Sequence, residues 1–288
     1  MIAPLTVLLV SALGVPGARE QGKCGGVPGF TQWTYKTTPT RELCAYVLKP
    51  AGTTVDAPAI LFFFGGGWRS GTPTQFASQA RYAASLGMVA LLVDYRTYRA
   101  DGTTPFQAVE DARSAVRWVR EKAVELGVDP WRIVAAGGSA GGHLAGATAI
   151  LDGPDDPHDN LKISCRPEAL VLFNPVVDTT PRGYGAAFIG PENEKLSLID
   201  HIRGGLPPSI IFHGTADQTV PVGTIERFVR LMKAAGNRCD LVAYPGGVHG
   251  FFNSPEFRPD TNLERYQDTL KRMNSFLISI GILRGAKP

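Results

Sequence analysis

Residues 132–141 read R-I-V-A-A-G-G-S-A-G, and they decide the fold class that this sequence predicts. The apolar run at 132–136 is typical of a buried strand, and the alanine-rich stretch after Ser139 can begin a helix. Between them, residues 137–141 fit the pattern G-x-S-x-G, in which a sharp strand-to-helix turn exposes the serine Oγ beside the first N–H groups of the helix. We therefore predict that Ser139 is a nucleophile. The alternatives are a plain glycine-rich turn and a phosphate-binding loop, but neither G-K-[ST] nor G-x-G-x-x-G occurs here to support phosphate.

Strands and helices alternate on both sides of this turn. We predict strands at residues 58–64, 88–95, 132–136, 169–177, 209–213 and 240–244, and the continuous apolar run at 58–64 is typical of a strand that is covered on both faces. We predict helices between and after them at residues 75–86, 105–126, from about 139 onward, 221–235 and 263–282, and an apolar stripe along 105–126 indicates that this helix packs against the sheet. Such alternation predicts an α/β fold with a mostly parallel central sheet flanked by helices. The long connection between residues 177 and 209 is the expected rim of an active site.

Composition and charge narrow the class of protein. The chain has 288 residues, of which 44% are apolar and 19% charged, so it can bury a sizeable core and is not globally disordered. The net charge is only +3, and the scattered Lys and Arg residues form no basic run. We therefore expect no nucleic-acid partner. No repeat or heptad indicates an oligomeric state.

The N-terminus predicts export. Residues 1–18 contain an apolar stretch that resembles a secretory signal peptide, which would make the protein secreted or periplasmic. The alternative is that this stretch is an apolar element of the fold itself. Nothing else approaches the ~20 apolar residues of a membrane span. We assign residues 19–56 to an N-terminal extension or minimal cap and residues 57–288 to the catalytic domain.

The four cysteines allow two interpretations. They are an even number, which fits disulfides in an exported protein, or they are four unpaired thiols; pairing is not readable from the sequence. No C-x-x-C spacing occurs, so no zinc site is expected. The cysteines are Cys24, Cys44, Cys165 and Cys239.

A serine nucleophile needs a general base, normally a histidine that a carboxylate orients. His249 lies in P-G-G-V-H-G-F-F directly after the last predicted strand, where a loop can bring it over Ser139. We predict that His249 is the base. The other histidines are expected to do other things: His143 is structural within the nucleophile helix, His158 is solvated, His201 lies near substrate, and His213 bonds nearby backbone.

Two aspartates compete for the role of orienting acid. Asp217, in H-G-T-A-D-Q-T-V-P, follows the strand predicted at 209–213, and Asp178 follows the preceding strand. Either could instead be a cap or a loop brace. The order Ser139, Asp217, His249, each after its own strand, favours Asp217.

These motifs together resemble the α/β-hydrolase fold, and within it the hormone-sensitive-lipase-like (bacterial family IV) esterases and their short acetylesterase-like members. The resemblance runs from about residue 57 to the C-terminus. It rests on F-G-G-G-W at 64–68, D-Y-R at 94–96, E-D-A-R-S-A-V-R-W-V at 110–119, G-G-S-A-G-G at 137–142, H-G-T-A-D at 213–217 and H-G-F at 249–251.

The resemblance implies that the H-G-G-G motif of this family falls on residues 64–67. The N–H groups of Gly66, Gly67 and Ala140 would then form the oxyanion hole. Phe64 replaces the family's bracing His, so the loop must be braced another way, and Gly138 replaces an Asp often found before the nucleophile. Phe64 and Trp68 are expected to shape a wall of the substrate pocket. The family's N-terminal cap is reduced to a minimal one here, which predicts an open site.

We expect a serine carboxylesterase that hydrolyses short, acetyl-type esters, such as acetylated carbohydrate, by a Ser-His-Asp acyl-enzyme mechanism without a metal or cofactor. A general detoxifying or lipase-like carboxylesterase is the alternative within the class. A catalytically inactive hydrolase fold used for binding is the alternative outside it.

Overall fold

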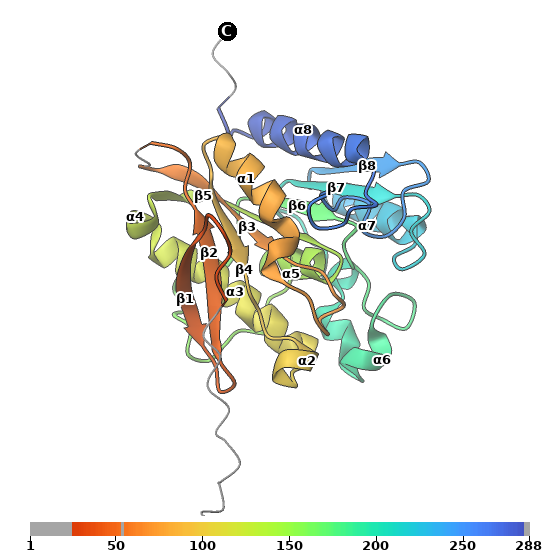
Figure 1. Ribbon diagram of the computed structural model, residues 1–288. Coiled ribbons are helices and arrows are strands. Elements are labelled where there is room, and N and C mark those ends of the chain that lie inside the picture. The colour runs from red at the N-terminus through yellow and green to blue at the C-terminus, as the bar shows by residue number, and fades with distance from the viewer. Residues whose placement is uncertain (1–24, 53–54, 285–288) are drawn as a thin grey trace, which may run out of the picture.

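A computed structural model describes residues 25–52 and 55–284, and it has one eight-stranded sheet with helices on both faces (Figure 1). The strand order is β1-β2-β4-β3-β5-β6-β7-β8. The pairs β1–β2 and β2–β4 are antiparallel, and every pair from β4 to β8 is parallel. The strands are β1 (Thr31–Thr37), β2 (Glu42–Leu48), β3 (Ala57–Phe63), β4 (Val89–Val93), β5 (Val128–Gly138), β6 (Ala169–Phe173), β7 (Ser209–Gly214) and β8 (Cys239–Tyr244).

The prediction of an α/β fold with a mostly parallel sheet is confirmed. One part of the predicted organisation is wrong: residues 31–48, assigned to an extension or minimal cap, instead form β1 and β2 of the central sheet. β1 carries the sequence T-Q-W-T-Y-K-T, and most of its side chains are at least partly exposed. An edge strand with so few buried apolar positions has no strong strand signal in a single sequence.

The helices divide into two layers, one on each face of the sheet. Helices α3, α5 and α7 share one apolar cluster with alternate residues of the strands, and η1, α1 and α8 share the other. Leu61 and Phe63 of β3 face the first layer, whereas Ile60 and Phe62 face the second, as strand periodicity requires. The helices are η1 (Pro73–Phe76), α1 (Ala77–Ser85), α2 (Tyr98–Asp101), α3 (Pro105–Glu121), α4 (Ala123–Leu126), α5 (Ala140–Ile150), α6 (Ala186–Ile189), η2 (Asn193–Leu196), η3 (Leu198–His201), α7 (Val222–Ala234) and α8 (Leu263–Ser279).

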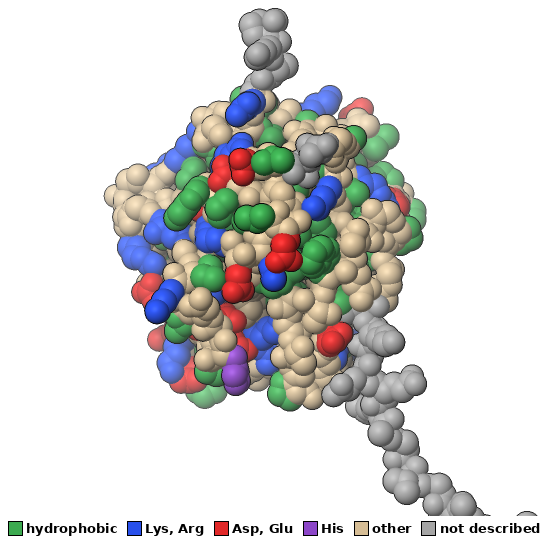
Figure 2. Space-filling view, turned by 90° about the vertical axis from the view of Figure 1, so that its left-hand side faces the viewer, with side chains coloured by type: hydrophobic (Ala, Val, Ile, Leu, Met, Phe, Trp, Pro, Cys, Tyr) green, Lys and Arg blue, Asp and Glu red, His purple; other side chains and the backbone are tan. Residues whose placement is uncertain are grey.

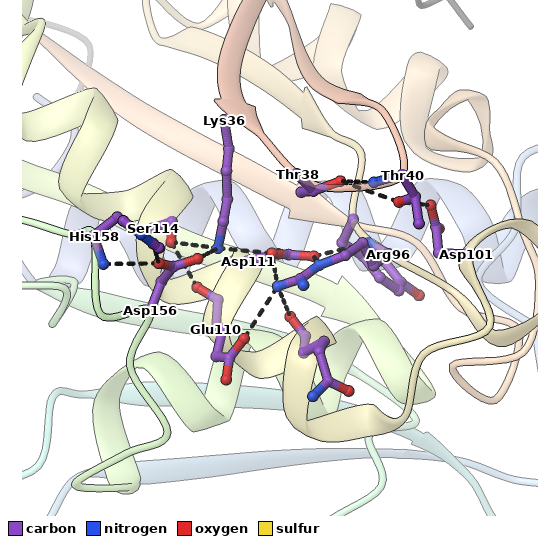
Figure 3. Close-up of polar contacts among 12 residues, drawn as sticks. Lys36, Thr38, Thr40, Arg96, Asp101, Glu110, Asp111, Ser114, Asp156 and His158 are labelled. Atoms are coloured by element: carbon purple, nitrogen blue, oxygen red, sulfur yellow. Dashed lines mark hydrogen bonds and ion pairs between the residues drawn. The ribbon is translucent and has the colours of Figure 1, made fainter. Parts of the chain in front are cut away.

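A buried polar cluster fastens β1 to α3. Asp111 of α3 is fully buried and accepts hydrogen bonds from Arg96 Nε at 2.8 Å and from Lys36 Nζ at 2.8 Å (Figure 3). Lys36 also reaches Asp156 Oδ2 at 2.6 Å, and His158 lies on the outer side of that carboxylate. The D-Y-R and E-D-A-R motifs therefore hold the sheet edge to its helix layer.

The surface around β1 and α4 has mixed charge. Figure 2 shows basic and acidic side chains interspersed among apolar ones on this face, without a continuous basic tract. Among residues 25–52 and 55–284, no helix has both the length and the apolar character needed to cross a membrane. The predicted signal peptide, residues 1–18, lies outside the described residues.

The cysteines do not all behave alike. Cys44 in β2 is disulfide-bonded, whereas Cys165 and Cys239 are buried free thiols. Cys24 lies outside the described residues. The two interpretations that the sequence left open therefore each apply to some of the cysteines.

Candidate active site

Ser139 lies at the junction of β5 and α5 in a strained backbone conformation. Its φ of 54° and ψ of −119° place a residue with a Cβ in a region that is rarely occupied. The turn is possible because Gly141 brings the first turn of α5 against the end of β3. A Cβ on Gly141 would overlap the carbonyl oxygens of Phe63 and Phe64. The predicted strand–turn–helix context of Ser139 is therefore present.

His249 and Asp217 complete a hydrogen-bonded chain to the serine. His249 Nε2 lies 2.9 Å from Ser139 Oγ, and His249 Nδ1 lies 2.7 Å from Asp217 Oδ2. A carboxylate can only accept, so Nδ1 carries the proton and Nε2 accepts from the serine hydroxyl. The three residues that the sequence predicted for the triad thus come together from the ends of β5, β7 and β8.

The environment of Asp217 keeps it ionised. Its side chain is fully buried, and Oδ1 accepts the N–H groups of Thr219 and Val220, both at 2.9 Å. Burial raises the pKa of Asp217, but hydrogen bonds from His249 and the Val220 backbone together lower it by more. The pKa of Asp217 therefore lies below its usual range. A charged carboxylate is therefore in place to stabilise an imidazolium on His249.

The rival carboxylate has a different role. Asp178 is buried and accepts hydrogen bonds from the N–H and Oγ1 of Thr180, at 3.0 and 2.6 Å. Its nearest cation is Arg227, at 3.8 Å. Asp178 therefore braces its own loop, which was the alternative interpretation for this residue.

The remaining histidines of the described chain are held by other groups. His143 Nε2 bonds the carbonyl of Leu196 at 2.7 Å, and burial lowers the pKa of His143 to about 4, despite this bond. His213 Nε2 lies 2.9 Å from Val220 O, and His201 Nδ1 lies 2.8 Å from Ser197 O. His158 is exposed. His143, His158 and His213 have the roles that the sequence predicts, whereas the hollow around Ser139 does not include His201.

The glycine loop after β3 leaves two backbone donors beside the serine. Gly66 has a φ of 122°, and a Cβ there would overlap Ser70 O, so this position requires glycine. The N–H groups of Gly66 and Gly67 have no acceptor within the part of the chain that the structure describes. Both glycines line the same hollow as Ser139 and His249, whose volume is about 350 Å³. Ala140, the third expected donor, is the first residue of α5.

The aromatic residues around this loop support it from behind. Phe64 and Trp68 are each only 1% exposed, and neither lines the hollow at the serine. Phe64 stacks on Tyr95 with ring centroids 4.1 Å apart, and Trp68 packs edge-on against His143 at 5.1 Å. The prediction that Phe64 and Trp68 form a wall of the substrate pocket is wrong. Both side chains pack into the core behind the loop.

Gln75 braces the glycine loop. Its Oε1 accepts the N–H of Gly65 at 2.7 Å, and its Nε2 donates to Asn253 Oδ1 at 2.9 Å. Asn253 Nδ2 donates in turn to the carbonyl of Gly250, next to His249, at 2.8 Å. The oxyanion loop and the histidine loop are therefore joined through two side-chain amides. Sequence reasoning missed both residues because an isolated Gln or Asn carries no positional signal.

The space beside Gly138 leaves no room for a side chain. A Cβ at this position would overlap the ring of Phe252, which is 1% exposed and packs against Phe76 and Phe173. The aromatic cluster beneath the nucleophile turn therefore occupies the space of any side chain here.

Comparisons with known proteins place this geometry in a family. Residues 46–181 match the family model BD-FAE, and residues 174–280 match the dienelactone hydrolase family. Carboxylesterase NlhH of Mycobacterium tuberculosis is 31% identical over 225 residues, which are 68% of this chain and 67% of that protein. A structure of Thermogutta terrifontis esterase 2 superposes with a TM-score of 0.86 at 45% identity, covering 91% of this chain and 98% of that one. The chain belongs to the α/β-hydrolase esterases.

Other members of these esterases show what related sites accept. Thermogutta terrifontis esterase 2 has been solved phosphorylated by paraoxon and with propionate or butyrate bound. The acetylxylan esterase of Xylanibacter ruminicola is 31% identical over 207 residues, which are 67% of this chain and 41% of that protein. The chain spans about half to two thirds of the length of the curated relatives that match first.

Proposed function

We propose that this chain is a serine carboxylesterase that hydrolyses short-chain acyl esters. The observation that carries the proposal is the continuous chain of hydrogen bonds from Asp217 through His249 to Ser139, beside the free N–H groups of Gly66 and Gly67. A nucleophile, a base with a fixed tautomer and an oxyanion site are the groups that acyl transfer needs.

The proposed reaction has two acyl-transfer steps. Ser139 Oγ attacks the ester carbonyl carbon while His249 Nε2 takes its proton, and Asp217 stabilises the imidazolium. The tetrahedral oxyanion is bound by the N–H groups of Gly66, Gly67 and Ala140, each worth about 3 kcal/mol in typical oxyanion holes. His249 then protonates the leaving alcohol. Water attacks the acyl-serine with His249 as base, and the acid is released.

Two features support a preference for short acyl groups, of acetyl to butyryl size. The hollow at Ser139 is only about 350 Å³, and Tyr184 from the 177–209 connection forms part of its wall. A related esterase of 45% identity binds propionate. We further propose that the enzyme belongs to the hormone-sensitive-lipase-like branch and that acetylated carbohydrate is one natural substrate, for which similarity to an acetylxylan esterase is the support.

The triad assignment is tested with Ser139→Ala. We expect the variant to lose at least about 10⁴-fold of kcat/KM on 4-nitrophenyl acetate while keeping the wild-type circular dichroism spectrum. A fluorophosphonate should label the wild type and not the variant. Retained turnover would overturn the assignment, and a wild type that is neither active nor labelled would indicate an inactive hydrolase fold.

The acyl preference is tested with a series of 4-nitrophenyl esters from acetate to decanoate, followed by acetylated xylan. We expect kcat/KM to peak between acetate and butyrate. A maximum at octanoate or longer would identify a lipase-like enzyme instead.

We propose that the protein is exported. The disulfide at Cys44 supports this, because disulfides form and persist in oxidising compartments. Cell fractionation with sequencing of the mature N-terminus tests the proposal. We expect the protein outside the cytoplasm with its first residues removed, and cytoplasmic protein that retains Met1 would contradict it.

A further inference from the structure

A second and larger hollow adjoins the one at Ser139. It has a volume of about 760 Å³, and its walls come from the segment 181–193 together with Gly67 and Arg69. Gly67 and Tyr184 line both hollows, so the two share a wall. A group attached to an ester at Ser139 can therefore extend over Tyr184 into this second hollow.

Arg69 is the only charged side chain among the residues that line the second hollow. No carboxylate of the described chain lies within ion-pairing distance of it, and its guanidinium stacks on the ring of Phe188 at 4.1 Å. Phe188 is itself fixed by an edge-on contact with Tyr98 at 5.5 Å, where α2 and α6 lie side by side (Figure 1). Stacking occupies the face of the guanidinium and leaves its N–H edge free, which is the edge that binds a carboxylate with two hydrogen bonds.

Two further arginines lie close to Arg69 or to the wall of the hollow. Arg99 is held beside it by a backbone hydrogen bond of 2.9 Å, and Arg182 lies between two residues that line the hollow. Within residues 25–52 and 55–284, the arginines whose guanidinium has no hydrogen bond or ion pair are Arg69, Arg99, Arg182, Arg230 and Arg284. Three of these five, Arg69, Arg99 and Arg182, therefore lie in or next to the segments that form the hollow, and of them Arg69 lines it.

The acidic residues of the same rim do not reverse this balance. Glu192 is paired with Lys195, and Glu194 is exposed and does not line the hollow. The remaining lining residues are Gly, Ala, Pro, Tyr, Phe and Asn, which bring no negative charge. The hollow is therefore an apolar-walled recess whose one charged lining residue is Arg69, and a cation in such a recess favours an anionic group.

We propose that this hollow is a subsite for a carboxylate carried by the ester substrate, with Arg69 as the residue that binds it. The inference rests on the proposed esterase function and adds a class of substrate to it. The carboxylate can belong to the acyl part, as in a dicarboxylic half-ester, or to the alcohol part, as in an acetylated hydroxy acid.

Matched pairs of charged and neutral esters test the subsite and distinguish the two sources. On the alcohol side the pair is 4-acetoxybenzoate and 4-acetoxybenzamide. On the acyl side it is the 4-nitrophenyl half-ester of glutaric acid and the corresponding glutaramic ester. For at least one pair, we expect the wild type to prefer the charged ester in kcat/KM. Arg69→Gln should reduce that preference about tenfold or more, since a hydrogen bond to a charged group has that effect.

Arg230→Gln is the matched control, because Arg230 is also an unpartnered arginine but lies on α7 away from the hollow. We expect it to keep the wild-type preference. A preference that is unchanged in Arg69→Gln for both pairs, or a loss that is equal in Arg230→Gln, would overturn the subsite.

Binding to Ser139→Ala gives a readout that does not depend on turnover. Calorimetry should show tighter binding of the charged member of the pair, and the difference should vanish in Ser139→Ala/Arg69→Gln. If the neutral esters are not hydrolysed by the wild type, the proposed function fails, and this binding difference still decides the subsite. Equal affinities of the charged and neutral esters would overturn it.

Discussion

At the residue scale, Gln75 is the least expected part of the site. Its single amide accepts from the oxyanion loop and donates toward the loop of His249, so one side chain fixes the separation of two catalytic groups. A side-chain amide suits this place because it offers a donor and an acceptor at once. The brace of the oxyanion loop therefore comes from η1 (Pro73–Phe76), an element that follows the loop in the chain.

Removing the amide of Gln75 should slow the chemistry more than it weakens binding. We expect Gln75→Leu to lower kcat on 4-nitrophenyl acetate by about ten- to a hundredfold, because oxyanion donors act only when they are well placed. KM should change less than threefold. The kcat of Gln75→Glu, whose side chain can still accept the N–H of Gly65, should lie between those of the wild type and Gln75→Leu. A purely structural role would instead lower the free energy of unfolding and leave kcat per folded molecule unchanged.

Gly138 gives a second test at the same scale. Gly138→Ala should reduce the free energy of unfolding by about 1–3 kcal/mol, because the new Cβ overlaps the Phe252 ring in a packed core. Chemical denaturation measures this loss. Gly138→Ala/Phe252→Leu should lose less than the sum of the two single variants, and strict additivity would show that the overlap is not the cause.

At the scale of elements, α5 is a helix with every residue buried, and it carries His143 one turn from the nucleophile. The cost of burying His143 is reduced because Nε2–H donates to Leu196 O and the ring stays neutral, whereas Nδ1 has no hydrogen-bond partner in the described chain. The indole of Trp68 packs edge-on against His143 of this helix. The free energy of unfolding should therefore depend on pH through His143.

The sign of that dependence follows from the lowered pKa of His143. The unfolded chain takes up a proton near pH 6.5 and the folded chain only near pH 4, so stability falls as the pH drops through this range. The wild type should lose about 3 kcal/mol more than His143→Gln between pH 7 and pH 4. His213, whose pKa burial also lowers, contributes equally to both proteins. Urea unfolding across this range measures the difference, and parallel curves would contradict the assignment.

The elements also differ in how well the sequence predicts them. The strands beside the site are marked by mostly apolar stretches, and Ser139, Asp217 and His249 each follow one of them, so their meeting at one sheet edge could be foreseen. β1 could not, because Lys36 points into a polar cluster and most of its neighbours are exposed. The prediction placed Phe64 and Trp68 on the substrate side of their loop, but they lie on its core side. A single sequence does not show whether an aromatic residue lines a pocket or packs behind it.

At the scale of the whole molecule, a covalent link is added to the noncovalent core. Cys44 is disulfide-bonded and completely buried in β2, where the antiparallel edge joins the parallel sheet. Cross-linking the chain there stabilises the fold chiefly by restricting the unfolded state. The thiols of Cys165 and Cys239 are buried and have raised pKa values because burial disfavours the thiolate, so they are poor partners for exchange.

Reduction should therefore destabilise the protein without changing its chemistry. We expect Cys44→Ala to lower the free energy of unfolding by about 2–4 kcal/mol. A phosphine reductant should lower the melting temperature of the wild type and leave that of Cys44→Ala unchanged. If the reductant lowers both equally, the disulfide is not the stabilising link.

The contact of Gly141 with the end of β3 determines which parts of the site can be varied by protein engineering. Backbone meets backbone there, so the nucleophile turn and the glycine loop cannot be redesigned separately, and libraries that vary residues 65–67 or 137–141 will consist mostly of misfolded clones. The opposite wall, between residues 181 and 193, belongs to a connection outside the sheet and has several exposed positions for new side chains, whereas Gly183 and Gly185 must stay glycine because a Cβ there would overlap Asp178 O or Trp68. Substitutions in that wall should change which esters are hydrolysed and leave the catalytic mechanism unchanged.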